Sequence, residues 1–344
     1  MTSPGEFAER DEAQDRALRP RSLAEFTGQA QLVENLGLAI TAAKGREEPV
    51  DHILLSGPPG LGKTTLAHIL SHEMGAGIQE TSGPMLEKPG DLAGILSTLQ
   101  AGSILFIDEA HALKRVVEEY LYSAMEDFRI TIQLGEGATT NALTLNLAPF
   151  TLVAATTREG QLTAPFRSRF GIRERLDLYS VDDLVRILSR SARLLDVEAE
   201  YDGLELIASR SRGTARYANN HLRRIRDLAQ VRYDNVITVA VADEGLRMLG
   251  IDGKGLTEID RRILKCLAAQ RKPGGGSRPV GLKTLAVTIG EDEATIEDVY
   301  EPYLIQSGLL AKTPQGRVLN AAGFEHVGEI PPADAPGGGQ TELF

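Results

Sequence analysis

Residues 52–70 place an apolar strand, a glycine-rich loop and an apolar-periodic helix in direct succession, HILLSGPPGLGKTTLAHIL. Gly57, Gly62, Lys63 and Thr64 fit the pattern G-x-x-x-x-G-K-[ST]. The glycines let backbone N–H groups turn inward around phosphate oxygens, and the helix N-terminus adds its dipole. We expect Lys63 to reach the β- and γ-phosphates of a nucleotide and Thr64 to ligate Mg²⁺. A chance glycine turn is the alternative, but the strand and the helix stand where the pattern needs them.

Two further apolar strands end in polar side chains. SILFIDEAH ends in Asp108 and Glu109, where one carboxylate can hold Mg²⁺ through water and the other can polarise an attacking water. FTLVAATTR ends in Thr156 and Thr157, whose hydroxyls can orient that water or sense the γ-phosphate. The alternative is that threonine simply suits a strand end. His111 shares no ligand spacing with another His or Cys, so we interpret it as an ordinary polar residue rather than a metal ligand.

Length and composition limit the class of protein. The chain has 344 residues, 42% hydrophobic and 25% charged, which predicts two or three globular domains. The single Cys266 excludes an internal disulfide. No apolar run approaches the roughly 18 residues of a membrane span, and residues 1–16 do not form a signal peptide, so we expect a cytoplasmic protein outside the membrane. The net charge of −11 argues against broad coating of nucleic acid, although a local basic patch is compatible with it.

Two arginines stand where they can reach a phosphate. Arg169 lies in the Gly- and Pro-marked segment APFRSRFGIRERL, directly after the third strand. An arginine there can point away from its own site and stabilise charge at the next subunit's phosphate. Arg216 lies in the first turn of a helix that follows Gly213 and Thr214. It can fold back onto the γ-phosphate from a second domain.

Residues 128–148 predict a β-hairpin inserted between the second and third strands. Apolar and polar residues alternate in two arms around a glycine-bearing loop. An exposed apolar face on such a hairpin needs a covering partner. The alternative is a hairpin folded onto its own core. The partner-facing residues we expect are Ile130, Ile132, Leu134, Leu143 and Leu145.

After GIDGKG (250–255) the pattern changes to three helices followed by LLAKTPQGRVLN, a strand, turn and strand. This order predicts a winged-helix domain, a DNA-binding shape. Lys312 and Arg317 flank the turn of the wing. We expect the Arg317 side chain to leave the turn with little obstruction, and both side chains to contact DNA phosphates. Residues 257–320 hold nine Lys/Arg and eight Asp/Glu. This near balance of charge favours a few localised contacts with DNA over a broad basic surface. A winged helix that binds only protein is the alternative.

The motifs GPPGLGKTT, LFIDEAH, AATTR, RSRFGI and GTARYAN, in this order, resemble those of AAA+ ATPases, and most closely the RuvB family of Holliday-junction motors. LRPRSLAEFTGQ, TSGPMLEKPGDLAGIL, AMEDF and IEDVYEPYLIQSGLL extend the resemblance over roughly residues 18–328. It implies an α/β fold, with a P-loop core built on a parallel sheet, an inserted hairpin, a helical lid and a winged-helix head. The expected parts are a flexible segment 1–17, the ATPase domain 18–179, the lid 180–252, the head 253–328 and a flexible tail 329–344.

The resemblance also implies roles for single residues. Thr157 corresponds to sensor 1, Arg169 to the arginine finger acting in trans and Arg216 to sensor 2, with ATP and Mg²⁺ bound. The implied nucleotide contacts are Leu18, Arg19, Gly60, Gly62, Lys63, Thr64, Thr65, Glu126, Asp127, Phe128, Tyr179 and Arg216. The chain departs from the family in DEAHAL, where Ile and Arg usually flank the His, and at Ala215, where Pro usually precedes the sensor arginine.

The activity implied is ATP-driven translocation of double-stranded DNA by a homohexamer ring, which drives branch migration in recombination and repair. RuvA is the partner implied for the hairpin, and the RuvC resolvase is a further candidate. The terminal QTELF resembles peptides that bind sliding clamps. Three rival classes fit less well. A DEAH helicase needs two RecA-like domains, a clamp loader does not combine this hairpin with a wing, and a non-catalytic scaffold does not need Lys63, Asp108, Glu109 and Arg169.

Overall fold

The computed structural model describes residues 17–134, 141–271, 277–332 and 335–336. The chain forms two compact units, Met1–Thr238 and Val239–Phe344, and each is described by itself. The N-terminal segment as far as residue 16, the hairpin tip at 135–140 and the QTELF tail lie outside the described residues. Among the residues that are described, no helix has the length and apolar character needed to cross a membrane.

A five-stranded sheet supports the phosphate loop in the first unit. Its strands run in the order β2-β3-β6-β1-β7, and all neighbours are parallel. Their bounds are β1 Ile53–Ser56, β2 Ile78–Ser82, β3 Ile104–Asp108, β6 Thr151–Thr156 and β7 Ile172–Arg175. β1 and β6 are buried along their whole lengths, as a parallel sheet covered on both faces requires. The carboxyl ends of β1, β3 and β6 meet at one edge, which brings the three motifs of the sequence together.

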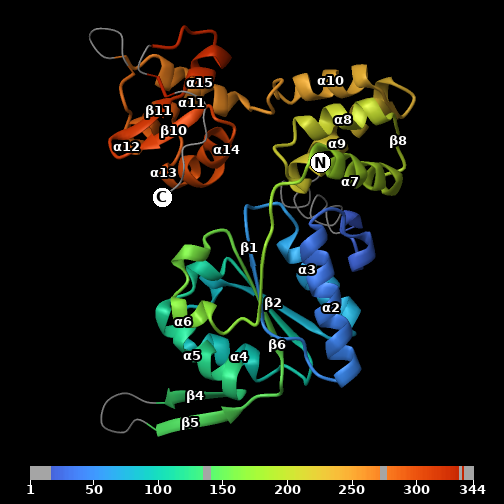
Figure 1. Cartoon of the computed structure of the whole chain (residues 1–344), viewed down its shortest axis with the longest axis vertical. Helices are drawn as coiled ribbons and strands as arrows, with labels where there is room; N and C mark the ends of the chain where they lie inside the picture. Colours follow the sequence, from blue (N-terminus) through green and yellow to red (C-terminus); the bar gives the residue numbers. More distant parts are fainter. Residues whose placement is uncertain (1–16, 135–140, 272–276, 333–334, 337–344) are drawn as a thin grey trace, which may run out of the picture. The chain divides into compact units, whose positions relative to one another are not determined.

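Helices cover both faces of this sheet (Figure 1). Leu54, Ile107 and Ala154 point to one face and share a core with helices α4 and α5, as the period-two alternation of strands dictates. In Figure 1, α2 and α3 lie on one side of the sheet and α4, α5 and α6 on the other. The helices are α2 Ala30–Arg46, α3 Lys63–Met74, α4 Pro89–Leu96, α5 Arg115–Asp127 and α6 Ala164–Arg167. Short 3₁₀ turns are η1 Leu23–Glu25, η2 Gly83–Met85, η3 Ala110–Ala112 and η5 Glu159–Gln161.

A helical segment completes the first unit after β7. It contains α7 Val181–Leu194, α8 Tyr201–Ser209 and α9 Ala215–Arg232, with a small parallel pair of β8 Glu198–Ala199 and β9 Val236–Ile237. The Thr214 side chain accepts a hydrogen bond from Tyr217 N and so caps α9. This cap fixes the first turn of α9, in which Arg216 lies.

The predicted hairpin is present, but most of its described apolar face packs in or against the core. β4 Arg129–Leu134 pairs antiparallel with β5 Asn141–Asn146, and the register places Ile130 opposite Leu145 and Ile132 opposite Leu143. Ile130 is fully buried, and Ile132 and Leu145 pack against the same core as α4 and α5. Leu143 is 43% exposed. The expectation that Ile130 faces a partner is therefore wrong, because the base of the hairpin folds onto its own domain. The Leu134 side chain lies outside the described residues.

The second unit contains the three helices and the wing that the sequence predicts. It is built from α10 Val239–Met248, α11 Glu258–Ala268, α12 Leu282–Ile289, α13 Glu293–Thr295, the π-helix η6 Ile296–Tyr300, α14 Glu301–Gln306 and α15 Ala321–His326. β10 Leu310–Thr313 and β11 Gly316–Leu319 pair antiparallel as the wing. The third predicted helix is interrupted by the π-turn just before Pro302, a residue with no N–H to donate within a helix.

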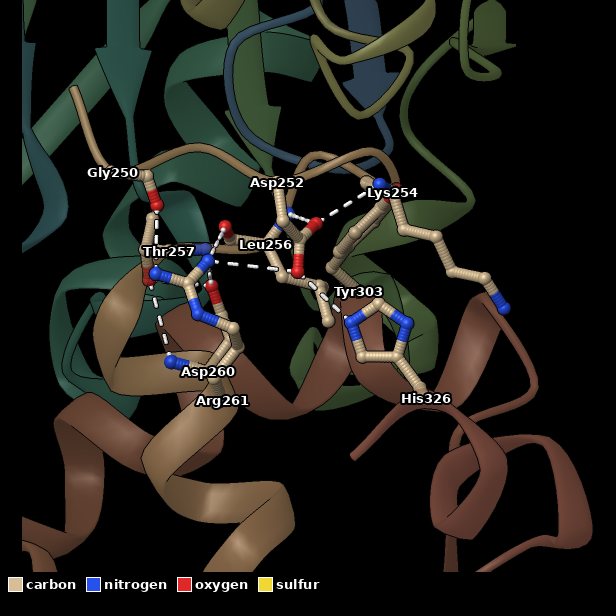
Figure 2. A network of polar contacts seen from close by, with 9 residues as sticks. All are labelled: Gly250, Asp252, Lys254, Leu256, Thr257, Asp260, Arg261, Tyr303 and His326. Carbon is tan, nitrogen blue, oxygen red and sulfur yellow. Dashed lines mark hydrogen bonds and ion pairs between the residues drawn. The ribbon is translucent and has the colours of Figure 1, made fainter. Parts of the chain in front are cut away.

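A polar network holds the segment between α10 and α11 (Figure 2). Asp252 accepts hydrogen bonds from Leu256 N at 2.9 Å and from the His326 ring of α15, also at 2.9 Å. Arg261 of α11 donates to Leu256 O at 2.8 Å and to Gly250 O at 2.9 Å. Burial alone would raise the pKa of Asp252, but the hydrogen bonds that Asp252 accepts from Leu256 and His326 hold that pKa below its ordinary value. The segment 250–256 is thereby fixed to the helices of the winged-helix fold.

Candidate nucleotide site

One glycine of the phosphate loop, Gly60, lies in close contact with helix α9. Gly60 has a φ of +79°, and a Cβ atom there would lie 2.9 Å from the Cβ of Arg216. Only glycine meets both conditions without strain. Arg216 N also donates to Gly60 O at 3.3 Å. The loop and the helix that carries Arg216 are therefore in direct contact.

Lys63 begins α3 at the end of the loop, and it is only 8% exposed. Its Nζ donates to Gly57 O at 2.7 Å and to Pro58 O at 2.8 Å. Burial lowers the pKa of Lys63 to about 8, an effect that Asp108 opposes and Arg216 adds to. The ammonium is thus held by weak carbonyl partners, which the negative oxygens of a phosphate can replace.

Two side chains are placed to hold Mg²⁺. Thr64 Oγ1 lies 3.5 Å from Asp108 Oδ2, so a hydroxyl and a carboxylate face one another beside the loop. Both are oxygen donors, which Mg²⁺ prefers, and a single carboxylate with phosphate and water completes the usual magnesium set in nucleotide enzymes. The donor set therefore fits the ion. Within the described residues no three His, Cys, Asp or Glu side chains gather into another metal site.

Glu109 follows directly in an unusual backbone conformation. Its φ is +49°, in the left-handed region that few residues other than glycine adopt. Its N–H donates to Asp108 Oδ1 at 2.8 Å, and its own side chain is exposed to the cavity. Strained backbone of this kind concentrates at functional sites. The conformation separates the two carboxylates, so that one is held and the other is free to meet a water.

A cavity of about 260 Å³ collects most of the predicted nucleotide contacts. Thr157 lines it, whereas Thr156 is buried, lies 3.1 Å from His111 Nδ1 and accepts from Arg158 N at 3.0 Å. The hydroxyl available to a nucleotide is therefore that of Thr157. The predicted residues in the lining are Arg19, Gly60, Gly62, Lys63, Thr64, Thr65, Asp108, Glu109, Thr157 and Arg216.

An adjoining pocket of about 90 Å³ contains two more of the predicted nucleotide contacts, Leu18 and Tyr179. The Tyr179 hydroxyl donates to Leu61 O of the loop at 2.8 Å, and burial raises the pKa of this phenol. Arg190 of α7 was not foreseen. It donates to Leu18 O at 2.7 Å and to Glu25 Oε2 at 2.9 Å, so it holds the segment that carries Leu18. In the sequence it is one charge among several on an amphipathic helix.

Four predicted residues lie elsewhere. The linings of these cavities, as far as the described residues go, contain neither Arg169 nor the segment 126–128. Glu126 instead pairs with Arg169, Asp127 pairs with Arg129 at 3.0 Å, and the Phe128 ring packs on Phe150. The expected contact of segment 126–128 with nucleotide therefore stays a prediction, and these residues do not line the described cavities around the chain's own phosphate loop. Of these residues, Glu126 contacts the predicted arginine finger directly.

The wing departs from expectation at Arg317. Its side chain is only 9% exposed and is bonded to the buried Glu301 carboxylate, with Nη2 donating to Oε2 at 3.0 Å. The expectation that this side chain leaves the turn freely is wrong, because a buried carboxylate on α14 needs its charge. Lys312 is half-exposed and pairs with Glu297 at 2.6 Å. Lys312 is therefore the more accessible of the two cations.

Comparison with known proteins finds similarity over most of the chain. Three family models match it: the Holliday junction DNA helicase RuvB P-loop domain over residues 18–176, the RuvB AAA lid domain over 179–252 and the RuvB C-terminal winged helix domain over 253–328. The Holliday junction branch migration complex subunit RuvB of Salinibacter ruber is 54% identical over 319 residues, which cover 93% of this chain and 92% of the relative.

Solved structures agree with these matches. The Holliday junction branch migration motor RuvB of Thermotoga maritima superposes with a TM-score of 0.81 at 47% identity, covering 92% of this chain and 100% of that one. A mutant of the same protein gives 0.81 at 48% identity, covering 91% and 98%. The expected fold, a P-loop core on a parallel sheet with a lid and a winged helix, is confirmed. The chain belongs to the RuvB family of AAA+ P-loop proteins.

Proposed function

We propose that this chain is the ATP-hydrolysing motor subunit that moves double-stranded DNA and drives branch migration of Holliday junctions together with RuvA. One observation carries the proposal. Lys63, Asp108, Glu109, Thr157 and Arg216 line a single cavity at the carboxyl ends of the parallel strands. This is where open α/β sheets bind ligands, and each side chain there matches a step of phosphoryl transfer to water.

The residues divide the chemistry among themselves. Loop N–H groups and Lys63 bind the β- and γ-phosphates. Thr64 and Asp108 are the residues that would hold Mg²⁺, which neutralises phosphate charge when bound. Glu109 accepts a proton from the attacking water and so makes it a better nucleophile. Thr157 orients that water or senses the γ-phosphate.

Arg216 links the nucleotide to the helical segment. It lies in the first turn of α9 and its backbone touches the loop at Gly60. A γ-phosphate attracts its guanidinium, and loss of that phosphate removes the attraction. The angle of α9 to the loop then depends on which nucleotide is bound. Such a dependence converts hydrolysis into motion.

Arg169 supports assembly into a ring. Its side chain lies outside the cavity that holds its own chain's phosphate-binding residues. A finger in this position has its target in a neighbouring subunit, which favours a homohexamer around DNA. Lys312 is the proposed phosphate contact on that DNA. The exposed part of the hairpin, with Leu143, is the proposed dock for RuvA. RuvC, a sliding clamp and a cytoplasmic location stay predictions.

The decisive experiment is ATP-dependent branch migration of a synthetic four-way junction, measured with and without RuvA. Lys63→Ala is expected to abolish hydrolysis and migration, because the phosphate charge loses its main cationic partner. Lys44→Ala is the matched control, since Lys44 pairs with Glu73 on the surface at 3.6 Å. Migration by the Lys63→Ala protein would contradict the site assignment. ATP turnover without migration of any junction, with RuvA present, would instead contradict the motor function.

A further inference from the structure

Arg169 is held in place by helix α5. Its guanidinium carbon lies 4.3 Å from the centre of the Tyr122 ring. Its Nη2 donates to Glu126 Oε2 at 3.3 Å, and its Nε lies 3.2 Å from Oε1 of the same carboxylate. Nη1 donates to Pro165 O at 2.6 Å. These contacts surround the side chain, which is only 20% exposed, and a guanidinium still keeps further N–H donors beyond those used here.

Tyr122 and Glu126 belong to a regular stripe on α5. Glu118, Tyr122 and Glu126 follow at intervals of four residues, so their side chains lie on one face of the helix. Glu118 Oε1 accepts from Thr163 N at 3.1 Å and from Thr163 Oγ1 at 2.8 Å. The Tyr122 hydroxyl lies 2.8 Å from Thr163 Oγ1. Because Thr163 gives its own proton to Glu118, Tyr122 is the donor in that bond.

The same stripe therefore holds both ends of the segment that carries Arg169. Thr163 caps α6 by accepting a hydrogen bond from Phe166 N at 3.3 Å. Glu118 and Tyr122 fix that cap, and Tyr122 and Glu126 then receive the guanidinium that follows the helix. A long arginine side chain has many rotamers, and holding it in one of them reduces the entropy lost when it meets a phosphate.

We infer that Tyr122 and Glu126 are positioning residues for Arg169, with the ring under the guanidinium and the carboxylate at one edge. The remaining N–H groups are then presented to the γ-phosphate of a neighbouring subunit. This inference rests on the proposed role of Arg169 as a finger acting in trans. A cation over an aromatic face is attracted electrostatically, and a planar guanidinium bound at one edge keeps its orientation.

The test compares ATP turnover by assembled, DNA-bound protein. Tyr122→Leu removes the aromatic face and is expected to lower kcat about tenfold, with ATP affinity unchanged because Tyr122 does not line the described nucleotide cavities. Tyr122→Phe keeps the face and is expected to retain most of the activity. Glu126→Gln is expected to lower kcat about threefold. Glu119→Gln is the matched control, because Glu119 pairs with Arg115 off the stripe at 3.4 Å, and it should turn over at the wild-type rate.

Two further measurements separate positioning from general damage to the fold. Tyr122→Leu combined with Arg169→Ala should be no slower than Arg169→Ala alone, since the loss acts through Arg169. Mixing Tyr122→Leu with Lys63→Ala should restore part of the activity. At a hybrid interface the Lys63→Ala subunit provides an intact finger and the other subunit an intact phosphate loop. An additional loss in the double variant, or no recovery at any mixing ratio, would overturn the inference.

The finger itself is tested separately. Arg169→Ala with near wild-type turnover would refute the proposed role of Arg169, and the inference would fail with it. Loss of turnover in Arg169→Ala, together with unchanged kcat in both Tyr122→Leu and Glu126→Gln, would refute the positioning role alone. If the thermal midpoint shows that Tyr122→Leu does not fold, the test uses Glu126→Gln instead, because the Glu126 side chain is exposed.

Discussion

Lys63 is a site residue whose charge depends strongly on its surroundings. Its pKa is about 8 because the side chain is buried, whereas a bound triphosphate would raise that pKa by direct attraction. The sign follows from linkage: a site that gains a proton on binding loses affinity as pH rises above the free pKa. We expect ATP affinity to be level below pH 8 and to fall by up to about tenfold per unit above it.

Titration calorimetry in buffers of different ionisation enthalpy checks this expectation, because it reports the affinity and the proton uptake together. Proton uptake should appear near pH 8 and rise toward one proton per site. Lys63→Arg is the control, since a guanidinium stays charged throughout this range and should show no such uptake. A flat affinity from pH 7 to 9.5 in the wild-type protein would contradict the assignment.

Arg317 and Lys312 are neighbours across the wing but should respond differently to substitution. Arg317→Ala leaves Glu301 buried without its partner, so we expect the second unit to lose about 3–5 kcal/mol of unfolding free energy. Lys312→Ala should leave stability near wild type and lower the log–log salt dependence of DNA binding by about one. Denaturant unfolding and binding to several unrelated duplexes over a salt series measure the two effects. Equal loss of salt dependence in both variants, without loss of stability, would contradict this division.

At the scale of elements, the hairpin has a buried base and an exposed arm. Leu143→Asp changes an exposed position, so we expect it to leave stability within about 0.5 kcal/mol and basal ATP turnover unchanged, but to abolish RuvA binding. Ile130→Asp puts a charge into the core and should cost more than about 4 kcal/mol. Thermal unfolding and a RuvA pull-down compare the two variants. RuvA binding at wild-type strength by Leu143→Asp would place the dock elsewhere.

The elements themselves could largely be predicted from the sequence. The strand–loop–helix with its G-x-x-x-x-G-K-[ST] pattern, the two strands that end at Asp108 and Thr156, the hairpin and the wing all carry local signals. These signals are hydrophobic period, turn residues and motif spacing, which depend on neighbouring residues only. The order of the five strands and the gathering of their ends into one cavity then follow from the parallel arrangement.

Contacts between distant segments could not be predicted in this way. His52 illustrates the limit. Its ring lies 3.1 Å from Met125 O and accepts from Leu152 N at 2.9 Å, so it joins the start of β1 to the end of α5 and to β6. Arg317 looked like a free cation because its partner Glu301 lies on another element. A single sequence gives the charge of each side chain but not which opposite charge the fold brings to it.

At the scale of the whole molecule, the nucleotide site and the wing lie in different units of the chain. In the proposed motor, the backbone between α10 and α11 is part of the covalent connection along which motion around the cavity would reach the wing. A loose segment would absorb that motion, whereas a segment fixed at several points transmits it. The Asp252 network fixes residues 250–256 to α11 and α15 through side chains of Arg261 and His326 (Figure 2). The network is therefore suited to coupling rather than to catalysis.

This reasoning leads to a prediction for Asp252. Asp252→Ala removes the acceptor of two backbone N–H groups and of the His326 ring, while no residue of the network lines the nucleotide cavity. We expect basal ATP turnover and DNA affinity near wild type. The amount of ATP consumed for each junction that branch migration carries to completion should rise about fivefold. Asp252→Asn, which keeps the shape and one acceptor, should show a smaller loss. Asp243→Ala, which breaks the Arg247 ion pair at 2.8 Å within α10 and lies outside the Asp252 network, is the control. If Asp252→Ala migrates junctions at the wild-type ATP cost, the segment does not transmit the motion, and the coupling must run through contacts between subunits.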